Sequence, residues 1–254
     1  MIEEAVILAA GMGTRIRKDD SDLPKPLHVV DGLSLLNRTI VSLRRGGVLR
    51  VVVVTGFMAP VVEAAIEADR AVYVANDVTV TTVRNAEYTL SNGISVVVGG
   101  RQCSGPFILS MADHLYSSEL VQMLRRQDLT AADLYLATDT RIASILDIDD
   151  ATKVRSHDGH IVQIGKAIPT YDRIDCGVFL VGQPLVDALA QVREENVSNE
   201  APTGNCSLSQ GVQRLADRGR ARIADIGDAW WQDVDTPEDM SHALATLQDQ
   251  LTRL

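Results

Sequence analysis

The sequence is poor in cysteine, and this scarcity already excludes some classes of protein. Its 254 residues include three cysteines, Cys103, Cys176 and Cys206, and no Cys-x-x-Cys pair. An odd number of widely spaced cysteines is typical of reduced thiols and argues against a disulfide framework or a cysteine metal site. We therefore expect free thiols and a cytoplasmic protein.

Positive charge is also in short supply. Lys and Arg number 24 against 34 Asp and Glu, which gives a formal net charge of −10. This argues against nucleic acid as a partner, because phosphate backbones are bound by basic surfaces. A nucleoside triphosphate is not excluded, because a few cations and a divalent metal ion can reverse the local field. In an acidic protein that handles phosphates, we expect some carboxylates to bind that metal.

Long apolar runs are missing as well. No stretch approaches the roughly 20 apolar residues of a membrane-spanning helix, and the N-terminus lacks a signal-peptide pattern. Hydrophobic residues nevertheless make up 46% of the chain, enough for a normal core. We expect one domain over residues 1–254 without membrane insertion, and the sequence leaves a monomer and a homodimer both open.

A glycine turn with two nearby cations is the most informative feature present. Residues 5–8 have the composition of a buried strand that runs into Gly11 and Gly13. Such a turn exposes backbone N–H groups that can hold a polyphosphate. Arg15 and Lys25 can direct two cations at the same phosphates. Together they favour a nucleotide site over a bare strand-to-loop turn.

Two other phosphate-binding loops are excluded. A dinucleotide-binding turn needs a third small residue where this chain has Ile16. A Walker loop needs Gly-Lys-Ser or Gly-Lys-Thr, and neither occurs. Residues 17–22 are polar and are expected to form a loop.

Strand-like and amphipathic segments alternate along the chain. This pattern predicts an α/β protein with a Rossmann-like three-layer α/β/α fold and a mixed, mostly parallel sheet. The expected strands are residues 48–55, 71–75, 107–111, 133–138, 175–181 and 221–226, with a hairpin around Asp158-Gly159. The expected helices are residues 35–45, 60–69, 117–126, 185–193, 208–218 and a last helix after Thr236. Residues 194–206 are expected to form a loop, and residues 91–100 favour a strand by propensity.

Carboxylates are expected at two strand ends. Asp113 follows one strand, and Asp233 and Asp235 precede the last helix. Ligands of open α/β sheets gather at the carboxyl ends of strands, and Mg²⁺ prefers carboxylate oxygens. We expect Asp113 and Asp235 to bind the metal, with Asp233 and His114 supporting them. The alternative is that the carboxylates only cap helices and that His114 is local structure.

Further cations are candidates for phosphate binding. Lys166 closes the predicted hairpin, where it would bind the acceptor phosphate or remain a solvated lysine. Arg101, Arg141 and Arg173 are weaker candidates that no motif supports.

The motifs occur in one order along nearly the whole chain. They are residues 8–15, Pro24-Lys25-Pro26-Leu27, Asn92-Gly93-Ile94-Ser95, residues 111–116, Ile164-Gly165-Lys166, Asp175-Cys176-Gly177 and residues 233–239. Together they resemble the CTP:inositol-1-phosphate cytidylyltransferases of the sugar nucleotidyltransferase-like superfamily. The resemblance implies a Mg²⁺-dependent enzyme that transfers CMP from CTP to inositol 1-phosphate and releases pyrophosphate. It also implies a helix, not a strand, at residues 91–100.

The resemblance carries roles over to individual positions. The catalytic residues would be Arg15, Lys25 and Lys166. The nucleotide would be held by Leu8, Ala9, Ala10, Gly11, Met12, Gly13, Thr14, Asn92, Gly93 and Ser95. Asp113 and Asp235 would bind Mg²⁺, and the acceptor would lie against residues 139–210.

Two departures from the family pattern leave the acceptor open. Ala112 stands where relatives commonly have Gly, and Cys176 where Thr is usual. A phosphonate, a phosphocholine-type acceptor and a sugar 1-phosphate remain alternatives to inositol 1-phosphate. A non-catalytic nucleotide sensor is the alternative from another class, and the retained cations and carboxylates weigh against it.

Overall fold

The computed structural model describes residues 2–16, 23–197 and 204–252. The predicted loop at residues 17–22 lies outside this range, as does the part of the second predicted loop at residues 198–203. No helix within the described ranges has both the length and the apolar character needed to cross a membrane.

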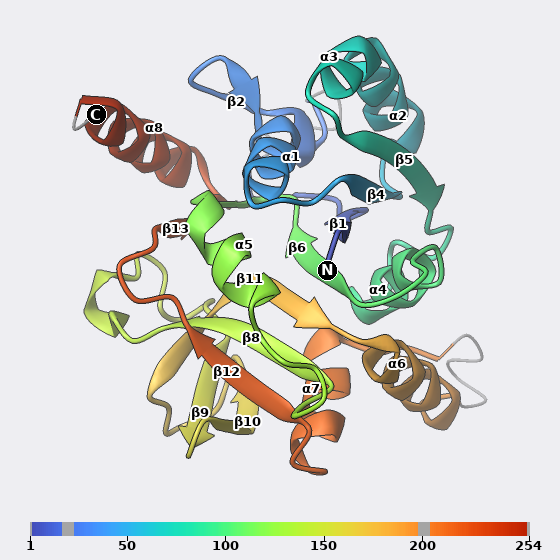
Figure 1. The fold of residues 1–254 in the computed structure, drawn as a ribbon, viewed down its shortest axis with the longest axis vertical. Coiled ribbons are helices and arrows are strands. Elements are labelled where there is room, and N and C mark those ends of the chain that lie inside the picture. Colours follow the sequence, from blue (N-terminus) through green and yellow to red (C-terminus); the bar gives the residue numbers. More distant parts are fainter. Residues whose placement is uncertain (1, 17–22, 198–203, 253–254) are drawn as a thin grey trace.

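A nine-stranded mixed sheet forms the centre of the molecule (Figure 1). Its strands, in order across the sheet, are β5 (Thr79–Arg84), β4 (Arg50–Thr55), β1 (Glu4–Ala9), β6 (Phe107–Met111), β11 (Arg173–Val181), β8 (Leu134–Asp139), β12 (Ala221–Asp225), β10 (His160–Gly165) and β9 (Lys153–His157). Strands β5, β4, β1 and β6 are parallel neighbours, as are β8 and β12. Strand β11 runs antiparallel between β6 and β8, so β8 points the same way as β6. The mixed, mostly parallel sheet confirms the predicted fold class.

Helices cover both faces of the sheet. They are α1 (Leu35–Arg45), α2 (Ala59–Ala68), α3 (Arg70–Ala75), α4 (Gly93–Gly100), α5 (Ser118–Arg125), α6 (Gln183–Glu195), α7 (Leu208–Ala216) and α8 (Pro237–Thr252). Successive residues of a strand point to opposite faces. Ile7 of β1 accordingly packs in one core with α1, α2 and α5, whereas Val6 packs in a second core with α4, α6 and α7. These two cores give the three layers that the alternation of segments predicted.

The strand predicted at residues 71–75 is wrong. These residues belong to helix α3, and the strand is β5, several residues later. Val72, Tyr73 and Val74 are residue types that favour strands by propensity. In the helix only Tyr73 is buried, where its hydroxyl donates to Asn37 Oδ1 (2.6 Å), while Val72 and Val74 are exposed. The sheet edge is instead supplied by Thr79–Arg84, which pairs in register with β4.

Helix α4 is the reverse case, because a valine-rich segment forms a helix. The resemblance predicted this helix, and the structure confirms it. The glycines at its end explain the outcome. A Cβ on Gly99 would lie 2.4 Å from Val6 Cγ1, and one on Gly100 would lie 2.6 Å from Val186 Cγ2. The close packing of α4 against β1 on one side and α6 on the other therefore outweighs the strand propensity of its valines.

Several short elements were not anticipated. They are the 3-10 turns η1 (Lys25–Leu27) and η2 (Ile142–Ser144) and the strands β2 (Val29–Val30), β3 (Leu33–Ser34), β7 (His114–Tyr116) and β13 (Trp231–Asp233). The predicted Asp158-Gly159 turn between β9 and β10 is confirmed, with positive φ at both residues. The predicted cap of α8 is also confirmed: Thr236 Oγ1 accepts from the Asp239 N–H (3.2 Å), and Asp239 Oδ2 accepts from the Thr236 N–H (2.8 Å).

Candidate active site

The glycine turn after β1 lies directly against Lys25. Gly13 has φ +60°, and a Cβ there would lie 2.6 Å from Lys25 Cβ. Only glycine fits this combination of left-handed backbone and close contact. The 3-10 turn Lys25–Leu27, flanked by Pro24 and His28, then places the lysine at the end of the sheet. The first two sequence motifs therefore form one surface.

Lys25 joins the two distant acidic segments. Its Nζ donates to Asp113 Oδ2 (2.7 Å) and to Asp235 Oδ1 (2.5 Å), and only 6% of the residue is exposed. Burial alone would lower the pKa of Lys25, but the charges of Asp113, Asp233 and Asp235 outweigh it and raise that pKa. Burial likewise favours a higher pKa for Asp113, yet the charge of Lys25 holds it below its usual range. Lys25 and Asp113 therefore stay ionised.

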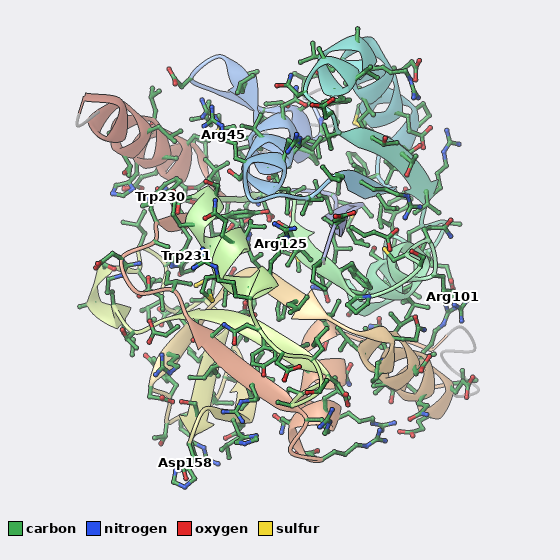
Figure 2. All side chains as sticks on the ribbon, in the orientation of Figure 1. Arg45, Arg101, Arg125, Asp158, Trp230 and Trp231 are labelled. Carbon is green, nitrogen blue, oxygen red and sulfur yellow. The ribbon has the colours of Figure 1, made fainter. Side chains whose placement is uncertain are left out.

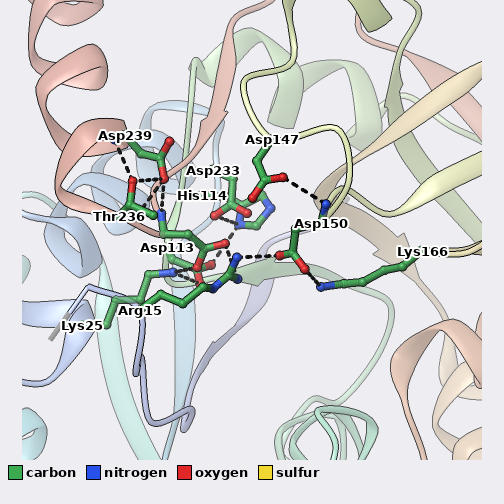
Figure 3. A network of polar contacts seen from close by, with 11 residues as sticks. Arg15, Lys25, Asp113, His114, Asp147, Asp150, Lys166, Asp233, Thr236 and Asp239 are labelled. Carbon is green, nitrogen blue, oxygen red and sulfur yellow. Dashed lines mark hydrogen bonds and ion pairs between the residues drawn. The ribbon is translucent and has the colours of Figure 1, made fainter.

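A chain of ion pairs continues from Lys25 across the cleft (Figure 3). Arg15 donates from Nη2 to Asp235 Oδ2 (2.6 Å) and contacts Asp150 Oδ2 through Nη1 (2.7 Å). Asp150 Oδ1 in turn lies 2.5 Å from Lys166 Nζ. Arg15 and Lys166 thus meet at one carboxylate. No sequence motif pointed to Asp150, because its segment between β8 and β9 has no recognisable pattern.

A group of potential metal ligands lies beside Lys25. Among the described residues, ligand atoms of Asp113, His114 and Asp233 lie within 4.8 Å of one another. The pairing of β7 with β13 sets Asp233 opposite His114, and His114 Nδ1 lies 2.9 Å from Asp113 Oδ1. Asp235 was predicted as the second ligand; its two oxygens contact Lys25 and Arg15.

The carboxylates of this group fit a cation. Asp233 Oδ1 is buried and has no hydrogen-bond donor among the described residues. Burial raises the pKa of Asp233 to about 7. Burial would lower the pKa of His114, but Asp233 and Asp113 raise it to about 9. A buried carboxylate oxygen without a donor is an oxygen ligand that a divalent ion could use.

Packing fixes the orientation of His114. Its ring stacks on Trp231 with centroids 6.0 Å apart and an interplanar angle of 15°. On the other side, a Cβ on Gly177 (φ +71°) would lie 2.3 Å from His114 Cδ2. Trp231 Nε1 donates to Asp139 Oδ2 (2.8 Å), which holds the indole in place.

Two cavities meet at these residues. The smaller measures about 320 Å³ and is lined mainly by the β1 turn, Lys25, Tyr88, Leu90, Asn92 and Ser95. The larger measures about 630 Å³ and lies between Lys166, Trp230 and the segment from Asp139 to Thr152. Both are lined by Arg15, Asn92, Met111, Asp113 and Asp235. The predicted phosphate and metal residues therefore lie at the junction of the two cavities, where a ligand in one cavity would contact a ligand in the other.

Most residues predicted to hold the nucleotide line the smaller cavity. Those that do are Leu8, Ala9, Ala10, Gly11, Gly13, Thr14, Asn92 and Ser95. Of the described candidates, Met12 and Gly93 lie outside that lining. Gly93 instead packs under Cys206, whose carbonyl accepts its N–H (3.1 Å). Ala112, at the position where relatives have Gly, has no positive φ, so its Cβ is accommodated there as expected.

The larger cavity is strongly acidic. Its carboxylates are Asp113, Asp139, Asp147, Asp150, Asp175, Asp233, Asp235 and Asp239. Burial raises the pKa of Asp175 to about 6, and its Oδ1 accepts from the Gly177 N–H (2.7 Å). Carboxylates accept hydrogen bonds from hydroxyl groups. This lining suits a ligand rich in hydroxyls that carries a small anionic group toward Arg15 and Lys166.

The weaker arginine candidates differ in position. Arg141 lines the larger cavity, where its guanidinium is held by both oxygens of Asp139. Arg173 pairs with Asp225 (2.5 Å) and lines neither cavity. Arg101 lies at the end of α4, on the far side of the molecule from Trp230 and Trp231 (Figure 2). Of the three, only Arg141 is placed to contact a bound substrate.

Residues 5–195 match the family model of the MobA-like NTP transferase domain. The chain is 36% identical to a bifunctional IPC transferase and DIPP synthase of Rubrobacter xylanophilus, over 93% of this chain and 50% of that protein. It is 34% identical to the protein of the same name from Thermococcus kodakarensis, over 95% of this chain and 50% of that one. The chain therefore spans about half the length of these relatives.

Solved structures give the same picture. The structure of the inositol-1-phosphate CTP transferase from T. maritima superposes with a TM-score of 0.78 at 27% identity, covering 94% of this chain and 91% of that one. A UDP-glucose pyrophosphorylase complexed with UDP-glucose superposes with a TM-score of 0.80 at 15% identity, covering 98% and 100%. The second likeness concerns the fold alone.

Proposed function

Because this chain belongs to the MobA-like NTP transferase family, we propose that it transfers CMP from CTP to inositol 1-phosphate, yielding CDP-inositol and pyrophosphate. The observation that carries the proposal is the junction of the two cavities at Arg15, Asp113 and Asp235. A transferase must bring two anionic substrates together, and this junction holds the fixed charges such a meeting requires. The names of the similar proteins support the choice of CTP and inositol 1-phosphate.

In this proposal the smaller cavity holds CTP. The β1 turn binds the triphosphate, and Asn92 and Ser95 lie against the ribose and cytosine. Lys25 stabilises the charge on the α-phosphate and on the leaving pyrophosphate, while Arg15 contacts the phosphates at the junction. The acceptor phosphate attacks the α-phosphorus in line with the departing pyrophosphate. No general base is needed, because the acceptor phosphate is already an anionic nucleophile.

Mg²⁺ belongs to the same proposal. Asp113 and Asp235 would hold it, with Asp233 and His114 next to them. When bound, the ion would neutralise phosphate charge as the α-phosphorus changes partners. Lys25 contacts one oxygen of each of the same two carboxylates and so fixes their positions relative to each other.

The larger cavity, within residues 139–210 and neighbouring segments, would hold the inositol ring. Its carboxylates accept hydrogen bonds from ring hydroxyls, and Lys166 binds the phosphate. A cytoplasmic location is also proposed, consistent with the three free cysteines. A homodimer remains a prediction that light scattering of the purified protein would test.

The proposed activity is tested by pyrophosphate release. CTP, UTP, dTTP and ATP are each combined with inositol 1-phosphate, phosphocholine, a phosphonate and glucose 1-phosphate in the presence of Mg²⁺. We expect the highest kcat/KM for CTP with inositol 1-phosphate. Preference for UTP or dTTP with the sugar phosphate would identify a sugar-1-phosphate enzyme, and binding without any release would identify a nucleotide sensor.

Lys166→Ala should raise the KM for the acceptor about tenfold and leave the KM for CTP nearly unchanged. The lysine is exposed at the end of β10, on the acceptor side of the junction, so its loss removes a charge-assisted contact to one substrate only. Steady-state kinetics with each substrate varied in turn measures the effect. Arg155→Ala is the matched control, because it removes an exposed cation from the same hairpin. An effect on CTP alone would refute the role of Lys166.

A further inference from the structure

One carboxylate connects the nucleotide side of the cleft to the acceptor side. Asp150 contacts Arg15 Nη1 through Oδ2 (2.7 Å) and Lys166 Nζ through Oδ1 (2.5 Å) (Figure 3). Arg15 follows the β1 turn, whereas Lys166 follows β10. The two cations are thus held at a single anionic group, although they come from segments far apart in the chain, and both line the larger cavity.

The backbone of Asp150 is anchored independently of these contacts. Its N–H donates to Asp147 Oδ1 (3.1 Å), and Lys153 Nζ donates to the neighbouring Asp149 carbonyl (3.0 Å). The Asp150 side chain is one-third exposed, at 34%. The carboxylate can therefore leave its partners without unfolding the segment that carries it.

A phosphate would compete with this carboxylate. Both groups accept charge-assisted hydrogen bonds from guanidinium and ammonium donors in similar geometry. Solvent-exposed ion pairs are weak, so a multiply charged phosphate can replace them. Under the proposed function, Arg15 and Lys166 bind phosphates of different substrates. Asp150 then competes with both substrates at once.

We infer that Asp150 is a positioning residue that couples the binding of the two substrates. When the nucleotide phosphates take Arg15, they displace the Asp150 carboxylate from the bridging position in which it also contacts Lys166. The acceptor phosphate then meets less competition at Lys166. By linkage, the acceptor favours nucleotide binding by the same factor. The inference rests on the proposed function for the identity of the two phosphates.

Calorimetric titration of Asp150→Asn tests this coupling. The ligands are the α,β-methylene analogue of CTP, which cannot react, and inositol 1-phosphate, each titrated alone and in the presence of the other. In the wild type we expect each ligand to lower the Kd of the other about threefold. In Asp150→Asn each ligand alone should bind about threefold more tightly, and the mutual effect should disappear.

Asp149→Asn is the matched control. It removes one negative charge from the adjacent residue, as Asp150→Asn does. Any gain in phosphate affinity that comes only from the lower negative charge should therefore appear in both variants. We expect wild-type coupling in this variant. Equal changes in both variants would overturn the inference, because the effect would then come from net charge.

Other outcomes also decide the matter. Unchanged affinities and coupling in Asp150→Asn would overturn the inference, and so would weaker acceptor binding, since Asp150 would then merely orient Lys166. The proposed function fails separately, when inositol 1-phosphate supports no pyrophosphate release. In that case the titration with the CTP analogue still tests the competition at Arg15. The inference requires the analogue, added without acceptor, to bind Asp150→Asn more tightly than the wild type.

Discussion

Lys25→Ala should lower kcat at least about a hundredfold. The lysine is buried, its aliphatic stem lies against Gly13, and its ammonium group contacts both Asp113 and Asp235. A preorganised charge in such a site stabilises the transition state far more than a solvated one would. Because this stabilisation develops with the transferred charge, kcat and kcat/KM should fall together. Rapid-quench or continuous pyrophosphate assays at saturating CTP and acceptor measure the loss.

The same substitution also removes a buried cation that Asp113 and Asp235 share, so Tm should fall even though Asp235 keeps its contact with Arg15. Lys153→Ala separates the two effects, because Lys153 is comparably buried, at 8% exposed, but its ammonium group donates to the Asp149 carbonyl and lines neither cavity. We expect this control to lower Tm while kcat stays within about threefold of the wild type. Wild-type turnover in a folded Lys25→Ala protein would remove Lys25 from the mechanism.

Asp113→Ala should also lower kcat at least about a hundredfold. Asp113 belongs both to the group that could hold a metal and to the ion pair with Lys25. Its loss would weaken the metal and leave Lys25 with one carboxylate partner at the junction. Activity measured across a Mg²⁺ titration should require more metal in the variant than in the wild type.

Asp147→Asn is the control for this experiment. Asp147 lines the same large cavity, but it lies outside the metal-ligand group. Its substitution should leave the Mg²⁺ requirement unchanged. If Asp113→Ala kept both its rate and its Mg²⁺ requirement, the metal would have to be held by Asp233 or Asp235 without Asp113.

Local sequence patterns predicted the elements that are specified by a few consecutive residues. The β1 strand, the capped helix α8 and the Asp158-Gly159 turn each carry their own signal within a few residues. Residues 71–75 show where such reasoning fails. They were expected to form a strand, but β5 supplies the sheet edge, and the segment is a helix in which only Tyr73 is buried.

Helix α4 needed information from outside its own residues. Its valines favour a strand, and only the family resemblance predicted the helix. The structure supplies the reason, since Gly99 and Gly100 let the helix pack against β1 and α6 more closely than any side chain would allow. Strand propensity describes a residue type averaged over many environments, whereas α4 lies unusually close to β1 and α6.

The sequence by itself predicted that a glycine turn, two cations and two acidic segments serve one phosphate chemistry, because backbone N–H groups, cations and carboxylates at strand ends are the groups that hold a metal-bound polyphosphate. Only the tertiary structure decided how the groups meet. Pairing of β7 with β13 set Asp233 beside His114, and the segment after β8 carried Asp150 to Arg15 and Lys166. Contacts of this kind join residues far apart in the chain through strand pairing and loop path, which leave no local pattern in the sequence.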